Sequence, residues 1–228
     1  MSAGVPERRA ILTSAVGIGL YAAAFGATFG AVSVGSGLSL AQTSVLSLVM
    51  FSGASQFAFV GVVGAGGSAW TALGPALLLA LRNGFYGVSL ATMLAPLGLR
   101  RVVTAHFVID ETTAMAVAQT ERRAQRLAFW ATGLVLFTCW QLGTVAGGLL
   151  GGAVDPQRLG LDAAAPAVFL ALLWPALRRV RARWVAVGGA AVALALVPVV
   201  PGGVPVLAAA AVAVLGGVLP LRGREPQP

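Results

Sequence analysis

A few charged and polar side chains inside otherwise apolar sequence are the residues of this chain best suited to do chemistry. Arg82 stands near the middle of an apolar run from about Trp70 to Leu97. At about 1.5 Å per residue, roughly 18 Å of helix separate it from either end of that run. An arginine side chain does not reach the lipid headgroups over such a distance, and facing lipid would cost it about 3 kcal/mol or more. Arg82 therefore needs an anionic partner or a hydrated cavity, which predicts a binding site at membrane depth.

Asn83 and Gly84 directly follow the arginine, and such a pair of residues is typical of turns. It weakens a helix where the surrounding lipid would otherwise seal the backbone. We therefore expect the third hydrophobic segment to be interrupted at Asn83-Gly84, beside a buried cation.

The second hydrophobic segment contains the polar sequence FSGASQF at positions 51–57. Within it, Gly53, Ser55 and Gln56 are expected to form an opened turn whose backbone and side-chain groups contact a polar solute. Hydrogen bonds between helices, worth about 0.6 kcal/mol each in membrane proteins, explain the same polar groups equally well.

The fourth segment carries three ionisable residues, His106, Asp110 and Glu111. His106 and Asp110 are four residues apart, which places them on one face of a helix, and Glu111 is turned by about 100° from that face. Ionisable residues in a membrane span usually belong to ion pairs or proton relays. One carboxylate would neutralise Arg82 and the other would bind a proton. The alternative is a structural Arg82–Asp110 pair, with Glu111 at the water boundary and a structural His106.

Two catalytic interpretations of these residues are weaker. Ser55 and His106 resemble the serine–histidine dyad of an intramembrane protease, but Gln56 stands where rhomboid-type proteases carry glycine after the serine. His106, Asp110 and Glu111 include only one histidine, which is weak evidence for a metal site. We predict no catalytic residue, no metal and no cofactor. The sequence has no Gly-Lys-Ser/Thr phosphate loop, which disfavours ATP-driven pumping.

The composition is that of an integral membrane protein. Of the 228 residues, 58% are hydrophobic and 10% are charged, whereas a soluble protein has about 25% charged residues. The net charge of +8 comes from arginines that cluster between apolar runs. This is the positive-inside pattern of a protein in a lipid bilayer and not a surface for nucleic acid.

The apolar runs predict an all-α, polytopic membrane helix bundle of seven or eight hydrophobic segments, some of them interrupted or re-entrant. We expect one integral-membrane domain over residues 1–228, with short cytoplasmic tails at about 1–9 and 222–228. The first apolar run exceeds the roughly 7–15 residues of a signal-peptide core, so we interpret it as an uncleaved span. The expected helices are 10–34, 42–65, 69–97, 102–120, 127–152, 164–178, 184–200 and 204–221.

The arginine clusters test how these segments are oriented. If the N-terminus is cytoplasmic and eight segments cross, Arg100 and Arg101 alone lie outside. If the second or third segment and also the fourth re-enter, every cluster lies inside and six segments cross fully. We expect a cytoplasmic N-terminus and leave the number of full crossings open. The pairs Gly26–Gly30, Gly143–Gly147 and Gly148–Gly152 are expected to let helices approach closely within the bundle.

Three sequence motifs occur in the order FSGASQF at 51–57, LRNGFYGVSL at 81–90 and DETT at 110–113. Together with the chain length and the glycine-rich first span, they resemble the AzlC family of branched-chain amino-acid permeases, the large subunits of bacterial two-component exporters. The resemblance covers nearly the whole chain and is most specific from about Gly26 to Thr113. Family members often carry an asparagine shortly before the arginine and a histidine directly after it, where this chain has Ala80 and Asn83.

The resemblance implies a secondary transporter, not an enzyme. It would export leucine, isoleucine, valine or similar neutral amino acids across the bacterial cytoplasmic (inner) membrane. Coupling to protons and a small AzlD-type membrane partner are implied as well. A non-transporting assembly partner and the protease remain the alternatives. The expected substrate-binding residues are Gly53, Ser55, Gln56, Arg82, Asn83 and Tyr86, the expected proton-coupling or ion-pair residues are Asp110, Glu111 and His106, and the expected apolar wall includes Phe57, Phe85 and Tyr86.

Overall fold

The computed structural model describes residues 5–95, 97–153, 170, 174, 176–200 and 204–218, and every regular element among them is a helix. This confirms the all-α prediction. Within the described residues, three helices are long and apolar enough to cross a membrane: α1 (Val5–Gly35), α4 (Ala69–Leu94) and α7 (Arg122–Ala153). The second and fourth hydrophobic segments are each divided into two short helices.

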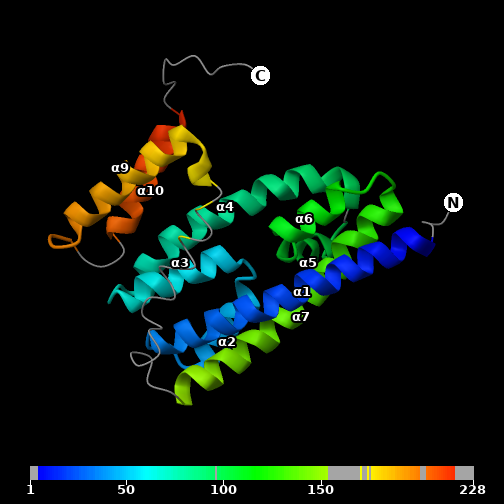
Figure 1. Ribbon diagram of the computed structural model, residues 1–228, viewed down its shortest axis with the longest axis horizontal. Coiled ribbons are helices and arrows are strands. Elements are labelled where there is room, and N and C mark those ends of the chain that lie inside the picture. Colours follow the sequence, from blue (N-terminus) through cyan, green and yellow to red (C-terminus); the bar gives the residue numbers. More distant parts are fainter. Residues whose placement is uncertain are drawn as a thin grey trace.

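α1 and α7 lie side by side and run in the same direction (Figure 1). Glycines permit this approach, because a Cβ atom on Gly30 would overlap the backbone oxygen of Thr144, and one on Gly147 would overlap that of Ala27. The predicted packing role is thus confirmed for the first two glycine pairs. Gly148 faces a different neighbour, Leu40.

The second segment folds back instead of crossing. α2 (Leu40–Val49) starts directly after α1, and α3 (Gly53–Gly64) returns to the same end of the bundle, where Gly64 packs on Ser36. The chain reverses at Met50–Ser52. We call α2, this turn and α3 the first hairpin.

Residues Gly53–Gln56 form the first turn of α3, so the opened turn predicted there lies three residues earlier. Ser52 precedes α3 in an extended conformation, with φ −157° and ψ 97°. Gly53 therefore begins α3, and the non-helical turn lies at the residues before it, Met50–Ser52.

α4 continues without interruption through Asn83 and Gly84, and the interruption predicted at this pair is wrong. A glycine inside a helix costs about 1 kcal/mol relative to alanine. An unsatisfied backbone group in hydrocarbon costs several kcal/mol. The helical hydrogen bonds therefore outweigh the turn preference of these two residues. α4 likewise continues through Pro75.

The fourth segment, predicted as one helix, is a second re-entrant hairpin. It consists of α5 (Arg100–His106), a turn at Phe107–Ile109 and α6 (Asp110–Val117). Phe107 packs on Gly133 in the middle of α7. Met115 lies back against the beginnings of α1 and α7, in a cluster with Ile11, Ala124, Leu127 and Ala128. We call α5, this turn and α6 the second hairpin.

The side chain of Thr112 fixes the start of α6. Its hydroxyl accepts the backbone N–H of Ile109 at 3.1 Å and lies 2.6 Å from the backbone oxygen of Phe107, to which it donates. Asp110 and Glu111 occupy the first turn, where the helix dipole favours acidic residues. His106 and Asp110 therefore belong to different helices, and the prediction that they share one helical face is wrong.

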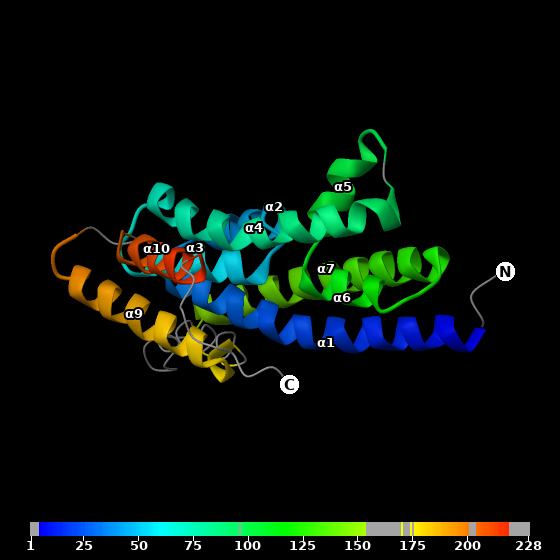
Figure 2. The same ribbon diagram turned by 90° about the horizontal axis from the view of Figure 1, so that it is seen from above.

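The chain thus contains two units of the same design in opposite orientation (Figure 2). In the first unit the candidate span α1 is followed by the first hairpin at its far end. In the second unit the candidate span α4 runs back and is followed by the second hairpin at the opposite end. The turns of both hairpins meet inside the bundle, where the ring of Phe51 lies 5.9 Å from that of Phe107.

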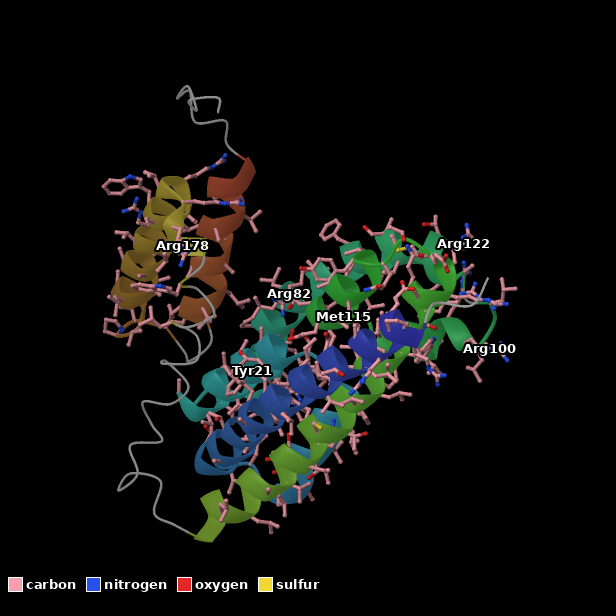
Figure 3. The ribbon with its side chains drawn as sticks, turned by 45° about the vertical axis from the view of Figure 1, so that its right-hand side comes forward. Tyr21, Arg82, Arg100, Met115, Arg122 and Arg178 are labelled. Atoms are coloured by element: carbon pink, nitrogen blue, oxygen red, sulfur yellow. The ribbon has the colours of Figure 1, made fainter. Side chains whose placement is uncertain are left out.

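Re-entry of the second and fourth segments corresponds to the second orientation considered above. Figure 3 shows Arg100 and Arg122 at the same end of the bundle as the start of α1. Arg8 and Arg9 belong to the second turn of α1. Three of the described arginine clusters, at 8–9, 100–101 and 122–126, therefore gather at one end. Arg178, from the fourth described cluster, lies away from that end in Figure 3, so the expectation that every cluster lies on one side is not met by this cluster.

Near the C-terminus, α9 (Val180–Leu196) and α10 (Val204–Val218) form an antiparallel pair beside α4. Leu207 of α10 packs on Gly74, and Arg181 of α9 donates to the backbone oxygen of Gly216. The short helix η1 (Ala176–Arg178) precedes α9. Most of the predicted helix at 164–178 lies outside the described residues.

Candidate functional site

A cavity of about 110 Å³ lies where the two hairpin turns meet between α1, α4 and α7. Residues from all five of these elements contribute to its walls. We call it the central cavity. It is lined by Tyr21, Ala22, Phe25, Phe51, Ser52, Gly53, Ala54, Phe57, Arg82, Ile109, Asp110, Glu111, Leu136 and Trp140.

The partner of Arg82 in the cavity is Asp110. The Nη2 atom of Arg82 lies 2.8 Å from Oδ2 of Asp110, and the two side chains are 40% and 41% exposed. The Nε–H of Arg82 is buried and has no hydrogen-bond partner in the described part of the chain. Tyr86, one turn further along α4, faces the same carboxylate. The ion pair therefore joins α4 to the start of α6 and leaves part of the guanidinium uncommitted.

Glu111 is a second carboxylate in the cavity and forms no ion pair with Arg82 at bonding distance. It follows Asp110 in the first turn of α6. With Arg82 paired to Asp110, Glu111 is the carboxylate of the cavity lining that has no cation at bonding distance.

The first hairpin contributes uncharged groups. The hydroxyl of Ser52 lies 3.2 Å from that of Ser55, and neither caps the start of α3. Gly53 gives space to Trp140, because a Cβ atom there would lie 3.1 Å from Cη2 of the indole. The start of α3 thus faces the cavity, with the indole of Trp140 packed beside Gly53.

Gln56 and Asn83 lie outside the cavity lining. Gln56 is 0% exposed, and among the described residues neither its amide nitrogen nor its amide oxygen has a hydrogen-bond partner. The Oδ1 atom of Asn83 is likewise buried without a partner in this part of the chain. A buried polar group left unsatisfied costs about 1–3 kcal/mol.

His106 lies outside the cavity, in an aromatic cluster. Its ring centroid is 5.8 Å from that of Phe51, 5.6 Å from Phe107 and 5.8 Å from Phe137. Ser55 forms its side-chain hydrogen bond with Ser52 and none with His106. The described residues therefore form no serine–histidine dyad, and they contain no group of three His, Cys, Asp or Glu side chains suited to a metal.

The apolar wall differs in part from the predicted one. Phe57 lines the cavity as expected. Phe85 is 74% exposed on the outer face of α4, and Tyr86 is not part of the lining. Sequence reasoning missed Tyr21 and Trp140, which come from α1 and α7. No local motif marks these two residues, because only the packing of distant helices brings them to the cavity.

Residues 17–154 match the family model described as AzlC protein. The chain belongs to the AzlC family. The matched region runs from within α1 to the end of α7, so the AzlC region contains both hairpins and the central cavity. It ends before α9 and α10.

Two curated relatives are similar to this AzlC protein. Inner membrane protein YgaZ of Escherichia coli is 28% identical over 161 residues, which cover 66% of this chain and 65% of YgaZ. The chain thus matches slightly less than two thirds of the length of YgaZ. An uncharacterized membrane protein of Helicobacter pylori is 26% identical over 176 residues, covering 75% of this chain and 77% of that protein. No solved structure matches the chain.

Proposed function

We propose that this membrane protein is a secondary transporter that exports branched-chain or related neutral amino acids across the cytoplasmic membrane in exchange for protons. The observation that carries the proposal is the central cavity, where an Arg82–Asp110 ion pair and Glu111 meet between two re-entrant hairpins. Secondary transporters bind their substrates at such interrupted helices, between units of inverted topology. Membership of the AzlC family supports the same class of function.

The walls of the cavity favour a small substrate with an aliphatic side chain. Phe25, Phe57 and Leu136 supply apolar surface, and the volume of about 110 Å³ is well below that of a site for drug-sized ligands, about 300 Å³ or more. An apolar pocket discriminates by only about 1–3 kcal/mol per methylene group. We therefore expect several related substrates.

The carboxylates support coupling to protons. Asp110 is held by Arg82, whereas Glu111 has no ion-pair partner among the described residues. Glu111 is the proposed proton carrier. A proton and a substrate ammonium would compete for this carboxylate, and such competition exchanges one for the other.

The proposed orientation places the N-terminus in the cytoplasm, because three arginine clusters gather at the end where α1 starts. The proposed location is the bacterial inner membrane, as the name of YgaZ states for that relative. The proposed partner is a small AzlD-type membrane subunit. Its support is the family resemblance.

The test is counterflow of labelled leucine in proteoliposomes, with and without the small partner, across an imposed pH gradient. We expect saturable uptake into leucine-loaded vesicles that responds to the gradient. Absence of saturable flux under all of these conditions would refute the transporter proposal. A non-transporting assembly partner would give that result.

A further inference from the structure

Two helices start at the central cavity, and their first turns differ. α6 begins with its own carboxylates, Asp110 and Glu111. α3 begins with Gly53 and Ala54 and has no acidic residue in its first turn. The start of a helix carries a partial positive charge and unpaired backbone N–H groups, so it attracts an anion. The chain supplies that anion to α6 and not to α3.

The donors at the start of α3 have no acceptor within the described part of the chain. No backbone or side-chain group accepts the N–H of Gly53 or Ala54, and the hydroxyl of Ser52 turns to Ser55 instead of capping the helix. Arg82 lines the same cavity with its buried Nε–H uncommitted. Gln56, in the same first turn of α3 but outside the cavity lining, is fully buried, and its amide atoms have no partner among the described residues. The N–H groups at the start of α3 and the Nε–H of Arg82 thus give the cavity hydrogen-bond donors that lack an anion.

The cavity also has an acidic side, formed by the first turn of α6. Asp110 and Glu111 bring two carboxylates, and Arg82 brings the one cationic side chain among the lining residues. When both carboxylates are ionised, one negative charge is left without a cation. A ligand ammonium group placed there restores the balance, since buried charges require partners.

We propose that the ligand of the central cavity is a zwitterion that lies across it, with its carboxylate on the N–H groups of Gly53 and Ala54 beside Arg82 and its ammonium group against Glu111 and Asp110. This orientation rests on the proposed function and adds to it. It assigns Gly53, through its backbone, to binding of the carboxylate, and it makes the first hairpin the anion-binding side and the second hairpin the cation-binding side.

A proline at position 53 removes one of the proposed donors. Proline is accommodated at the first position of a helix, and the extended conformation of Ser52 is the one that a following proline requires. Gly53→Ala is the matched control, because it adds a Cβ atom at the same distance from Trp140 and keeps the N–H. The ratio of the dissociation constants of the two variants therefore measures the loss of the N–H donor separately from the steric effect of the added Cβ atom.

The ligands to compare are leucine, isocaproate, which lacks the ammonium group, and isoamylamine, which lacks the carboxylate. Binding to the purified full-length protein is measured by calorimetry, and Trp140 in the cavity wall offers a fluorescence signal. We expect leucine and isocaproate to bind roughly tenfold or more weakly to Gly53→Pro than to Gly53→Ala, as for loss of a charge-assisted hydrogen bond. Isoamylamine should bind both variants equally. In Glu111→Gln the order should reverse, with isoamylamine and leucine weakened and isocaproate unchanged.

Equal leucine binding by the two variants at position 53, with saturable binding by the wild type, would overturn the orientation and leave the proposed function standing. Absence of leucine binding and flux in the wild type would overturn both. If Gly53→Pro does not fold, the orientation is tested by comparing the binding of leucinamide and leucine to the wild type. It keeps the ammonium group and loses the carboxylate charge, so binding as tight as that of leucine would overturn the orientation.

Discussion

The two hairpins have the same shape and opposite chemistry. Each enters the bundle, turns near its middle and starts a second helix at the central cavity. The first hairpin brings Ser52 and Gly53 to that point, and the second brings Asp110 and Glu111. A shared backbone design therefore gives one cavity an uncharged side that donates hydrogen bonds and an acidic side.

The hairpins also differ in what holds them. The first is joined to α1 and α7 by hydroxyl and indole groups, with Ser33 and Thr43 at 2.7 Å and the indole N–H of Trp140 donating to Ser47 at 3.1 Å. The second fixes its own turn through Thr112 and is joined to α4 by the Arg82–Asp110 ion pair. An ion pair responds to protonation and to a charged ligand, whereas a hydroxyl network does not. The second hairpin is thus the side where charge is expected to control structure.

The largest effect is expected from breaking that ion pair. Arg82→Gln leaves Asp110 without its cation and removes the positive group of the cavity. We expect transport of leucine to fall by at least about 100-fold and the protein to lose about 1–3 kcal/mol of stability, the range for an unpaired hydrogen-bonding group. Flux in proteoliposomes and thermal unfolding in detergent measure the two quantities.

The double variant Arg82→Gln with Asp110→Asn separates the two roles of the pair. It restores neutrality, so we expect most of the lost stability to return while transport stays absent. Recovery of transport as well would mean that the pair is only structural, and the contrast between the hairpins would then concern folding alone.

Glu111 is expected to give an intermediate effect that depends on pH. The groups facing it are Asp110 beside it, Tyr21 from α1, and Arg82 and Tyr86 from α4. The carboxyl group of Glu111 binds a proton at low pH and loses it as the pH rises through its pKa. Leucine competes with this proton, so affinity should increase with pH across that interval.

In Glu111→Gln the side chain stays neutral at every pH. We expect leucine affinity to become independent of pH and to match the weak affinity of the wild type at low pH, about tenfold below its best value. Calorimetric titrations from acidic to slightly alkaline buffer measure this. An unchanged pH profile in the variant would exclude Glu111 as the proton carrier. The proposed contrast between an uncharged first hairpin and a proton-binding second hairpin would then not hold.

The sequence predicted the charged side of the cavity better than the shape of the second hairpin. Arg82 in mid-segment required an anion, and Asp110 supplies it. The split at Phe107–Ile109 was missed, although Asp110, Glu111 and Thr112 are residues that favour a helix start. The apolar pattern runs through the split without a change of period, so hydrophobicity gave no sign of it.

The opposite error occurred at Asn83-Gly84, where local turn preference predicted an interruption in a helix that is continuous. For the first hairpin, the polar motif at 51–57 located the interruption to within a few residues. Tyr21 and Trp140 reach the cavity only because α1 and α7 pack in parallel. The two residues are about 120 positions apart in the chain, and contacts at such separation leave no local pattern in the sequence. His106 was named with the ionisable candidates, with a structural histidine as the alternative, and it lies in an aromatic cluster outside the cavity lining.

The smallest effect is expected from the hydroxyl network of the first hairpin. Ser47→Ala leaves the indole N–H of Trp140 and the hydroxyl of Thr144 without this partner. Hydrogen bonds between membrane helices average about 0.6 kcal/mol and reach about 1.7, so we expect a loss of about 1 kcal/mol in thermal unfolding. Ser44→Ala is the control, because the Ser44 hydroxyl donates to Leu40 within α2 itself. The pH dependence of leucine affinity should be the same in both variants as in the wild type, since no charge is involved. A shifted pH profile in Ser47→Ala would show that the two hairpins are coupled through Trp140 and do not act as separate sides of the cavity.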